Sequence, residues 1–129
     1  MAARSVIETF REGATNMRVP SDLFAEDIQL YGSLTHKPFQ GKDAVTVIID
    51  MLLHVCEDLE YVAEHMSDDR VALLVRGRIK DRQFDGAMFL TFNSEGLIIE
   101  SRDFVRPMSA LLALQEAAGQ YLTEHAAAT

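Results

Sequence analysis

The fold of this chain is decided by residues 71–106, VALLVRGRIKDRQFDGAMFLTFNSEGLIIESRDFVR. Apolar and polar residues alternate here with the two-residue period of half-buried β-strands, and turn-forming residues interrupt the alternation. Including the segment just before it, we expect strands over 59–66, 71–80, 84–92 and 97–105. The turn NSEG at 93–96 contains a glycine, which accepts a positive φ. Strands that follow one another through short turns predict a twisted, antiparallel sheet.

Helices are predicted on both sides of this stretch, because apolar residues recur there every three or four positions. The expected helices cover about 5–17, 21–25 and 42–56 before the long strands and about 107–125 after them, and the sheet covers about 27–31 and 59–106. Residues 1–129 are thus expected to form a single α+β domain. Its N-terminal helices pack on a curved, mostly antiparallel sheet, and a further helix follows. Such a sheet wraps into a cone, and its mouth is a natural ligand site.

Composition argues against several kinds of partner. The formal net charge of −8 repels phosphate backbones and anionic lipid, so we expect neither nucleic acid nor a membrane as a partner. The single cysteine, Cys56, cannot form an internal disulfide, and the histidines lack metal-ligand spacing. Without a phosphate-binding glycine loop we also expect no cofactor. The charged residues at 1–13 are unlike a signal peptide, which favours a cytoplasmic location.

Asp103 is the residue that most strongly suggests chemistry. It alternates with Ser101 and Val105 on the less charged face of its strand, so we expect it to point into the cone. A buried carboxylate is costly unless it is paired or neutralised, and a raised pKa suits a general acid or base. Asp103 is therefore a candidate catalytic residue. The alternative is a structural aspartate tied to an arginine or to backbone amides.

Arg76 is the second candidate catalytic residue. It shares one face of its strand with Arg78, opposite a face that is entirely apolar. An arginine inside the cone would pair with Asp103 and orient it. In the alternative interpretation both arginines face solvent or a dimer interface. Because each face of this strand carries apolar residues, a homodimer through the sheet is also expected.

Six residues are candidates for binding a ligand in the cone, namely Tyr31, Ser33, His36, Tyr61, Met88 and Phe84. A tyrosine hydroxyl donates to a ligand oxygen, although the alternation around Tyr31 points that residue outward. Ser33 and His36 lie in the loop expected at the mouth. The aromatic and methionine residues either line a cavity or fill it, and the sequence leaves both interpretations open.

Short strings along the chain give a family resemblance. FAED at Phe24–Asp27, FQGKDAV at Phe39–Val45 and SRDFVRP at Ser101–Pro107 resemble the nuclear transport factor 2-like superfamily, in its SnoaL-like branch. The run RPMSALLALQEAAG at Arg106–Gly119 is similar to a tail of uncharacterised bacterial members. The resemblance covers nearly the whole chain up to the last helix and implies a cone-shaped fold. The superfamily holds isomerases, cyclases, dehydratases, epoxide hydrolases and non-enzymatic modules, so it does not imply one activity.

The limonene epoxide hydrolases are the nearest enzyme branch. Their WRDYF string resembles SRDF, which implies that Asp103 activates water. Their arginine–acid pair matches Arg76, with Arg78 at the position of the acid, and Arg78 cannot donate a proton at neutral pH. The tyrosine and asparagine that hold the water fall on Tyr31 and Ser33 when GKDAV is the anchor. Anchoring on FAED instead shifts both positions by one residue.

In a second branch, the ketosteroid isomerases, the two acidic positions fall on Gly32 and Met88, which cannot carry a proton. The resemblance therefore implies a SnoaL-like protein that binds a small, largely apolar molecule in a conical pocket, with acid/base chemistry at Asp103. An epoxide hydrolase-like or isomerase/cyclase-like enzyme remains an alternative. A non-catalytic dimeric binding module is another.

Overall fold

The structure of the protein, a computed structural model, describes residues 5–127. Within that range the elements are α1 (Val6–Thr15), a short 3-10 helix (Ser21–Leu23), β1 (Phe24–Tyr31), β2 (Phe39–Gln40), α2 (Lys42–Val55), β3 (Cys56–Ser67), β4 (Arg70–Ile79), β5 (Arg82–Phe92), β6 (Ile98–Arg106) and α3 (Met108–Ala127). The strands lie close to their expected positions. Two strands begin three residues earlier than expected. β3 begins at Cys56, directly after α2, rather than at residue 59, and β1 begins at Phe24 rather than at residue 27, because the short helix expected over 21–25 ends at Leu23.

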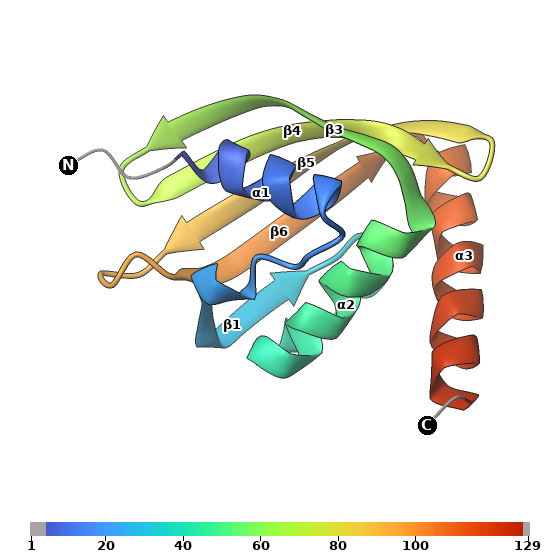
Figure 1. Cartoon of the computed structure of the whole chain (residues 1–129), viewed down its shortest axis with the longest axis horizontal. Coiled ribbons are helices and arrows are strands. Elements are labelled where there is room, and N and C mark those ends of the chain that lie inside the picture. Colours follow the sequence, from blue (N-terminus) through green and yellow to red (C-terminus); the bar gives the residue numbers. More distant parts are fainter. Residues whose placement is uncertain (1–4, 128–129) are drawn as a thin grey trace.

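One curved sheet contains the six strands of residues 5–127, in the order β2-β1-β6-β5-β4-β3 (Figure 1). Neighbouring strands are antiparallel, except that β1 and β6 run parallel. α1 and α2 lie over one face of the sheet, which we call the inner face, and α3 stands beside α2 at one end (Figure 1). The predicted α+β architecture, with a mostly antiparallel sheet and an additional C-terminal helix, is confirmed.

α1 is shorter than the helix predicted over 5–17, because backbone hydrogen bonds close its last turn. The amide of Arg18 donates to the carbonyl oxygen of Gly13 at 2.8 Å, and the amide of Met17 donates to that of Ala14 at 3.4 Å. This pair of bonds is a Schellman motif, which ends a helix at a residue of positive φ. Met17 has a φ of 53°, and its side chain is exposed.

An irregularity in β3 changes the direction of its side chains. The register against β4 shifts between Tyr61 and Ala63, so β3 carries one extra residue at this point. Strict alternation would place His65 on the same face as Tyr61. After the bulge His65 lies on the outer face and is exposed, while Tyr61 is buried on the inner face.

The core consists of two clusters of buried side chains. The larger cluster, around Ile28, Leu73 and Ile98, lies between the sheet and the helices α1 and α2. The smaller cluster, around Ile79 and Leu114, lies under α3. Leu52 and Val75 pack against both clusters. The space between the two clusters is where the candidate site is found.

No helix in the described part of the chain combines the length and the apolar character that crossing a membrane requires.

Candidate functional site

The inner face of β6 carries the candidate acid. Ser101 and Asp103 point toward the helices, whereas Arg102 and Phe104 between and after them are exposed on the opposite face. The predicted inward direction of Asp103 is therefore found. Its side chain is half-buried by area, and it lines two connected hollows beneath the sheet.

The inner cavity has a volume of about 90 Å³. Its walls are almost entirely apolar and come from both core clusters, including Phe10, Ile49, Leu52, Val75, Ile79, Phe84, Met88 and Leu114. Among the residues that line this cavity, Asp103 carries the one carboxyl group. The other two ionisable side chains of the lining are those of Tyr61 and Cys56. A single carboxyl group thus faces an otherwise apolar space.

A larger mouth pocket, with a volume of about 320 Å³, adjoins this cavity. It is formed by the loop after β1, by α2 and by α3, and its lining includes Ser33, Thr35, Phe39, Gln115 and Leu122. Leu52, Asp103, Val105 and Leu114 line both spaces. Asp103 therefore sits where the mouth pocket passes into the inner cavity.

Burial controls the proton affinity of Asp103. Loss of hydration raises the pKa of its carboxyl group to about 6, although a hydrogen bond from Ser101 opposes this rise. The Ser101 hydroxyl donates to Asp103 Oδ1 at 2.7 Å. Within residues 5–127 no hydrogen bond is made to Oδ2 and no arginine or lysine pairs with this carboxyl group. The oxygen Oδ2 is thus available to a ligand.

The backbone of Asp103 is anchored from the mouth loop. Ser33 donates from its hydroxyl to the carbonyl oxygen of Asp103 at 2.8 Å. This bond joins the loop after β1 to the middle of β6, so Ser33 holds the strand segment from which the carboxyl group projects. Ser33 also lines the mouth pocket, which makes it both a positioning residue and a wall residue.

Tyr61 is the second polar group of the inner cavity. Its ring packs edge-on against Phe10, with ring centroids 5.8 Å apart. Burial raises the pKa of its hydroxyl, and the negative charge of Asp103 raises it further, followed by that of Cys56. The hydroxyl therefore keeps its proton, and it makes no hydrogen bond within the described residues. It is a free donor in the cavity that Asp103 also lines.

The bulge in β3 is held from α1. Arg11 donates from Nε and Nη2 to the carbonyl oxygen of Tyr61, at 3.1 and 2.7 Å. Because a forked guanidinium fixes the acceptor in position, Arg11 fixes the backbone that directs the Tyr61 ring inward. The sequence alone contains no signal for this contact, because it joins positions fifty residues apart.

Cys56 lines the cavity as an unreactive thiol. Burial raises its pKa to about 12, and only the thiolate is an effective nucleophile.

Glycine at position 86 helps to keep the cavity open. A Cβ atom there would lie 3.0 Å from the carbonyl oxygen of Phe104 and 3.1 Å from Val75 Cγ1, so a side chain at this position would force the backbone of the curved sheet apart.

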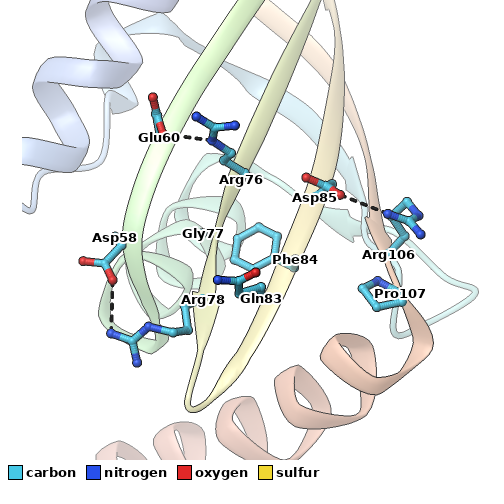
Figure 2. Close-up of a pocket in the computed structure, with 10 residues that line it drawn as sticks. All are labelled: Asp58, Glu60, Arg76, Gly77, Arg78, Gln83, Phe84, Asp85, Arg106 and Pro107. Carbon is cyan, nitrogen blue, oxygen red and sulfur yellow. Dashed lines mark hydrogen bonds and ion pairs between the residues drawn. The ribbon is translucent and has the colours of Figure 1, made fainter.

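The outer face contains a different, larger hollow of about 560 Å³ (Figure 2). Its walls carry Glu60, Arg76, Asp85 and Arg106, which form two ion pairs. Arg76 Nε donates to Glu60 Oε1 at 2.9 Å, and Arg106 Nη1 donates to Asp85 Oδ2 at 3.0 Å. All four side chains are more than half exposed. Their charges are paired and hydrated, so this hollow is not a dry, apolar space.

The expected pairing of Arg76 with Asp103 is wrong. Arg76 and Asp103 lie on opposite faces of the sheet, and the guanidinium of Arg76 binds Glu60 instead. The side chain that follows it on the same face, Arg78, binds Asp58 at 3.1 Å and Glu57 at 3.4 Å. The alternative interpretation, in which both arginines face outward, describes their positions.

The other candidates divide into two groups. Tyr61, Met88 and Phe84 line the inner cavity, and Ser33 lines the mouth pocket. Tyr31 and His36 line neither. The ring of Tyr31 stacks under the guanidinium of Arg102 on the outer face, 4.0 Å from its centroid, and its hydroxyl donates to Gln29.

Several lining residues were not predicted. Thr35, Gln115 and Leu122 of the mouth pocket come from a loop and from α3, and nothing in their spacing marks them as neighbours.

In the described part of the chain no group of three or more histidine, cysteine, aspartate or glutamate side chains is arranged to hold a metal ion.

Comparison with known proteins supports the fold. No family model and no curated protein sequence matches this chain. Among solved structures, a steroid delta-isomerase from Pseudomonas aeruginosa is similar with a TM-score of 0.88 and 27% identity, over 93% of this chain and 90% of that one. A putative SnoaL-like polyketide cyclase from a Jannaschia species has a TM-score of 0.63 and 16% identity, over 92% and 97%.

A third similar structure is a hypothetical protein with a ketosteroid isomerase-like fold from Catenulispora acidiphila, in complex with trimethylamine. Its TM-score is 0.62 at 17% identity, over 84% of this chain and 92% of that one. The names of these and other similar structures include ketosteroid isomerase-like, SnoaL-like and NTF2-like proteins. The fold implied by the resemblance of the sequence is thus confirmed.

Proposed function

We propose that this protein binds a small, largely apolar molecule in the inner cavity and mouth pocket, and that Asp103 exchanges a proton with it. The observation that carries the proposal is the isolated carboxyl group at the junction of the two spaces. Its pKa of about 6 leaves it mostly ionised at neutral pH, yet close enough to that pH to accept and return a proton. Asp103 would therefore act first as a general base.

The dimensions of the two spaces limit the ligand. The inner cavity of about 90 Å³ admits a group of a few heavy atoms, since a water molecule occupies about 30 Å³. The remainder of the ligand would lie in the mouth pocket of about 320 Å³. Because the walls are apolar, the part that enters the inner cavity would be a hydrocarbon with one oxygen-bearing group directed at Tyr61 and Asp103.

The two polar groups have complementary roles in this proposal. Oδ2 of Asp103 accepts a proton from the ligand, and the protonated Tyr61 hydroxyl donates a hydrogen bond to the oxygen on which negative charge develops. The Ser101 hydroxyl, 2.7 Å from Asp103 Oδ1, keeps the carboxyl group in one orientation. The arrangement needs only these three side chains and a dry cavity.

The similar structures favour proton transfer without defining the substrate. One of them is named a steroid delta-isomerase and another a putative SnoaL-like polyketide cyclase, names that refer to isomerisation and to ring closure. The positions that the resemblance assigns to the acids of ketosteroid isomerases are Gly32 and Met88 here, and both line the hollows. Asp103 lies directly opposite Met88 on the neighbouring strand. A different acid in the same space would give a related reaction with a different substrate geometry.

Replacement of Asp103 tests the proposal. A panel of small apolar ketones, phenols and epoxides is screened for displacement of 1-anilinonaphthalene-8-sulfonate and for turnover by mass spectrometry. For a compound that is turned over, we expect Asp103→Asn to lower kcat by a factor of about 100 or more. The dissociation constant of that compound should change only a few-fold. Asp81→Asn, at an exposed turn, is the matched control. Equal turnover by Asp103→Asn would remove the catalytic role.

A second candidate function, a dimeric binding module without catalysis, is favoured by the outer face of the sheet. Leu74, Phe89 and Phe104 are large apolar side chains exposed there, and such a patch is typical of an interaction surface. In this alternative a second copy covers the outer face, and the cavity binds its ligand without changing it. Binding without turnover of any compound in the panel would select it. We propose pairing through the sheet in either case.

A further inference from the structure

Most glycines of the chain have a structural reason to be glycine. Two have the positive φ that other residues rarely adopt, namely Gly41 and Gly96. At three more, a Cβ atom would lie no more than 3.0 Å from a backbone carbonyl oxygen, namely Gly13, Gly77 and Gly86. Neither reason applies to Gly32 and Gly119, which have no positive φ. Apart from the adjoining backbone, a Cβ atom at either position would meet no heavy atom within 4 Å.

Both of these glycines line the mouth pocket. Gly32 directly follows β1 and lies two residues after Leu30, which is buried and lines the same pocket. Because strand side chains alternate, a side chain at position 32 would point the same way. On α3, Gly119 lies four residues after Gln115 and three before Leu122, which also line the pocket. Residues at this spacing share one face of a helix, so the two glycines belong to two different walls of the pocket.

Gly119 is unfavourable for the helix that contains it. It lies in the interior of α3, which runs from Met108 to Ala127. In a helix interior glycine is less favourable than every residue except proline. Alanine would stabilise α3 at this position, and there is open space for its methyl group. A residue that weakens its helix without relieving a clash indicates that the space beside it is used.

Two large apolar side chains of the mouth pocket are exposed close to these glycines. Leu34 follows Gly32 by two residues and is 37% exposed, and Leu122 on α3 is 39% exposed. Both line the pocket. A ligand that occupies the space beside the glycines would cover both leucines, and removal of their surface from water would favour binding.

We propose that Gly32 and Gly119 set the width of the mouth pocket, so that it accepts a ligand whose body is a ring or a branched chain. This inference rests on the binding in the inner cavity and mouth pocket proposed above. The inner cavity takes only a narrow group, so selection by width acts on the part of the ligand that stays in the mouth.

The space that the glycines leave is a sizeable part of the pocket. A methyl group at each position would occupy a volume similar to that of a water molecule, about 30 Å³, in a pocket of about 320 Å³. A straight hydrocarbon chain has many rotatable bonds and bends past such an obstacle. A rigid ring system cannot change its width, so added methyl groups would exclude it by overpacking.

Two ketones with the same number of carbon atoms test this selection. 2-Decanone is a straight chain, and 2-decalone has two fused rings. Their dissociation constants are measured on the full chain by isothermal titration calorimetry. We expect Gly32→Ala and Gly119→Ala each to weaken binding of 2-decalone about tenfold, and Gly119→Leu to weaken it about 100-fold or more. Binding of 2-decanone should change less than about threefold in the two alanine variants.

Thermal melts of the same variants give a second result, of opposite sign. Alanine favours a helix more than glycine does, so we expect Gly119→Ala to raise the melting temperature by about 2–6 °C while it weakens binding of 2-decalone. A purely structural position would not combine these two effects. Gln120→Leu is the matched control, at the next position of α3, which is exposed and outside the pocket lining. It should leave the ratio of the two dissociation constants unchanged.

The outcomes separate this inference from the proposed function. If the original chain binds neither ketone, the proposed binding of an apolar molecule is overturned, and the role of the two glycines with it. If the original chain binds 2-decanone alone, or if the glycine variants lose both ketones equally or lose neither, only the selection by width is overturned. If it binds 2-decalone alone, a graded loss from Gly119→Ala to Gly119→Leu supports the selection, and an absent loss overturns it.

Discussion

Carboxyl groups on the two faces of the sheet lie in opposite kinds of environment. On the inner face Asp103 has no cationic partner within the described residues, one hydrogen bond to its carboxyl group, and a pKa raised by burial to about 6. On the outer face Asp85, on the neighbouring strand, is exposed and paired with Arg106 at 3.0 Å. The outer groups are arranged in complementary pairs, whereas the inner group is left without a partner of opposite charge.

This difference shows why the larger hollow is not the better candidate for chemistry. The outer hollow of about 560 Å³ contains many more charged groups, but water and ion pairs satisfy them. The inner cavity of about 90 Å³ contains one. A proton-transfer site needs a group whose two protonation states have similar free energies near the working pH, and burial of a single carboxyl group provides that condition.

The largest expected effect contrasts two adjacent leucines of β4. Leu73 is completely buried on the inner face, and Leu74 is 41% exposed on the outer one. We expect Leu73→Ala to lower the free energy of unfolding by about 2–5 kcal/mol and Leu74→Ala to lower it by less than about 1 kcal/mol. Urea unfolding at two protein concentrations separates folding from assembly. Similar losses for both variants would contradict the assignment of inner and outer faces.

The second expected effect is a pH dependence that belongs to Asp103. Its folded pKa of about 6 lies above the ordinary value of 3.8, so the folded chain holds the proton more tightly than the unfolded chain does. The resulting stabilisation is present below about pH 4 and is lost as the pH rises through about 6. The loss amounts to about 3 kcal/mol.

The measurement is the free energy of unfolding between pH 4 and pH 8 for the original chain and for Asp103→Asn. The variant lacks the titrating group, so we expect the difference between the two to change by about 2 kcal/mol over this range, the rest of the effect falling below pH 4. The variant becomes relatively more stable at the higher pH. Asp81→Asn, which also removes one carboxyl group, is the control. A constant difference for Asp103→Asn would mean that its carboxyl group is hydrated.

The smallest expected effect concerns Arg76. Its pair with Glu60 is exposed on both sides, and such pairs contribute about 0–1 kcal/mol. We therefore expect Arg76→Gln to change the free energy of unfolding by less than about 1 kcal/mol and to leave the pH dependence assigned to Asp103 unchanged. A shift of that pH dependence would indicate that Arg76 does act on Asp103.

Much of the fold followed from local patterns, but the site followed from them only in part. Alternation along 97–105 correctly predicted that Asp103 points inward, because a regular strand keeps its period. The same reasoning did not predict that Arg76 lies on the outer face, because both faces of β4 carry apolar residues. Alternation also places His65 on the wrong face of the sheet, because the bulge in β3 adds one residue that the two-residue period does not reveal. Tyr31 was included as a ligand residue although its own alternation pointed outward.

The sequence by itself determined the elements, their order and the faces of the regular strands, because these depend on spacings of a few residues. Only the tertiary structure decided that Asp103 has no charged partner, that Ser33 and Arg11 anchor the walls, and that α3 completes the mouth pocket. These features join residues far apart in the chain. Their geometry depends on how the curved sheet and the helices pack, and the local periods carry no information about that packing.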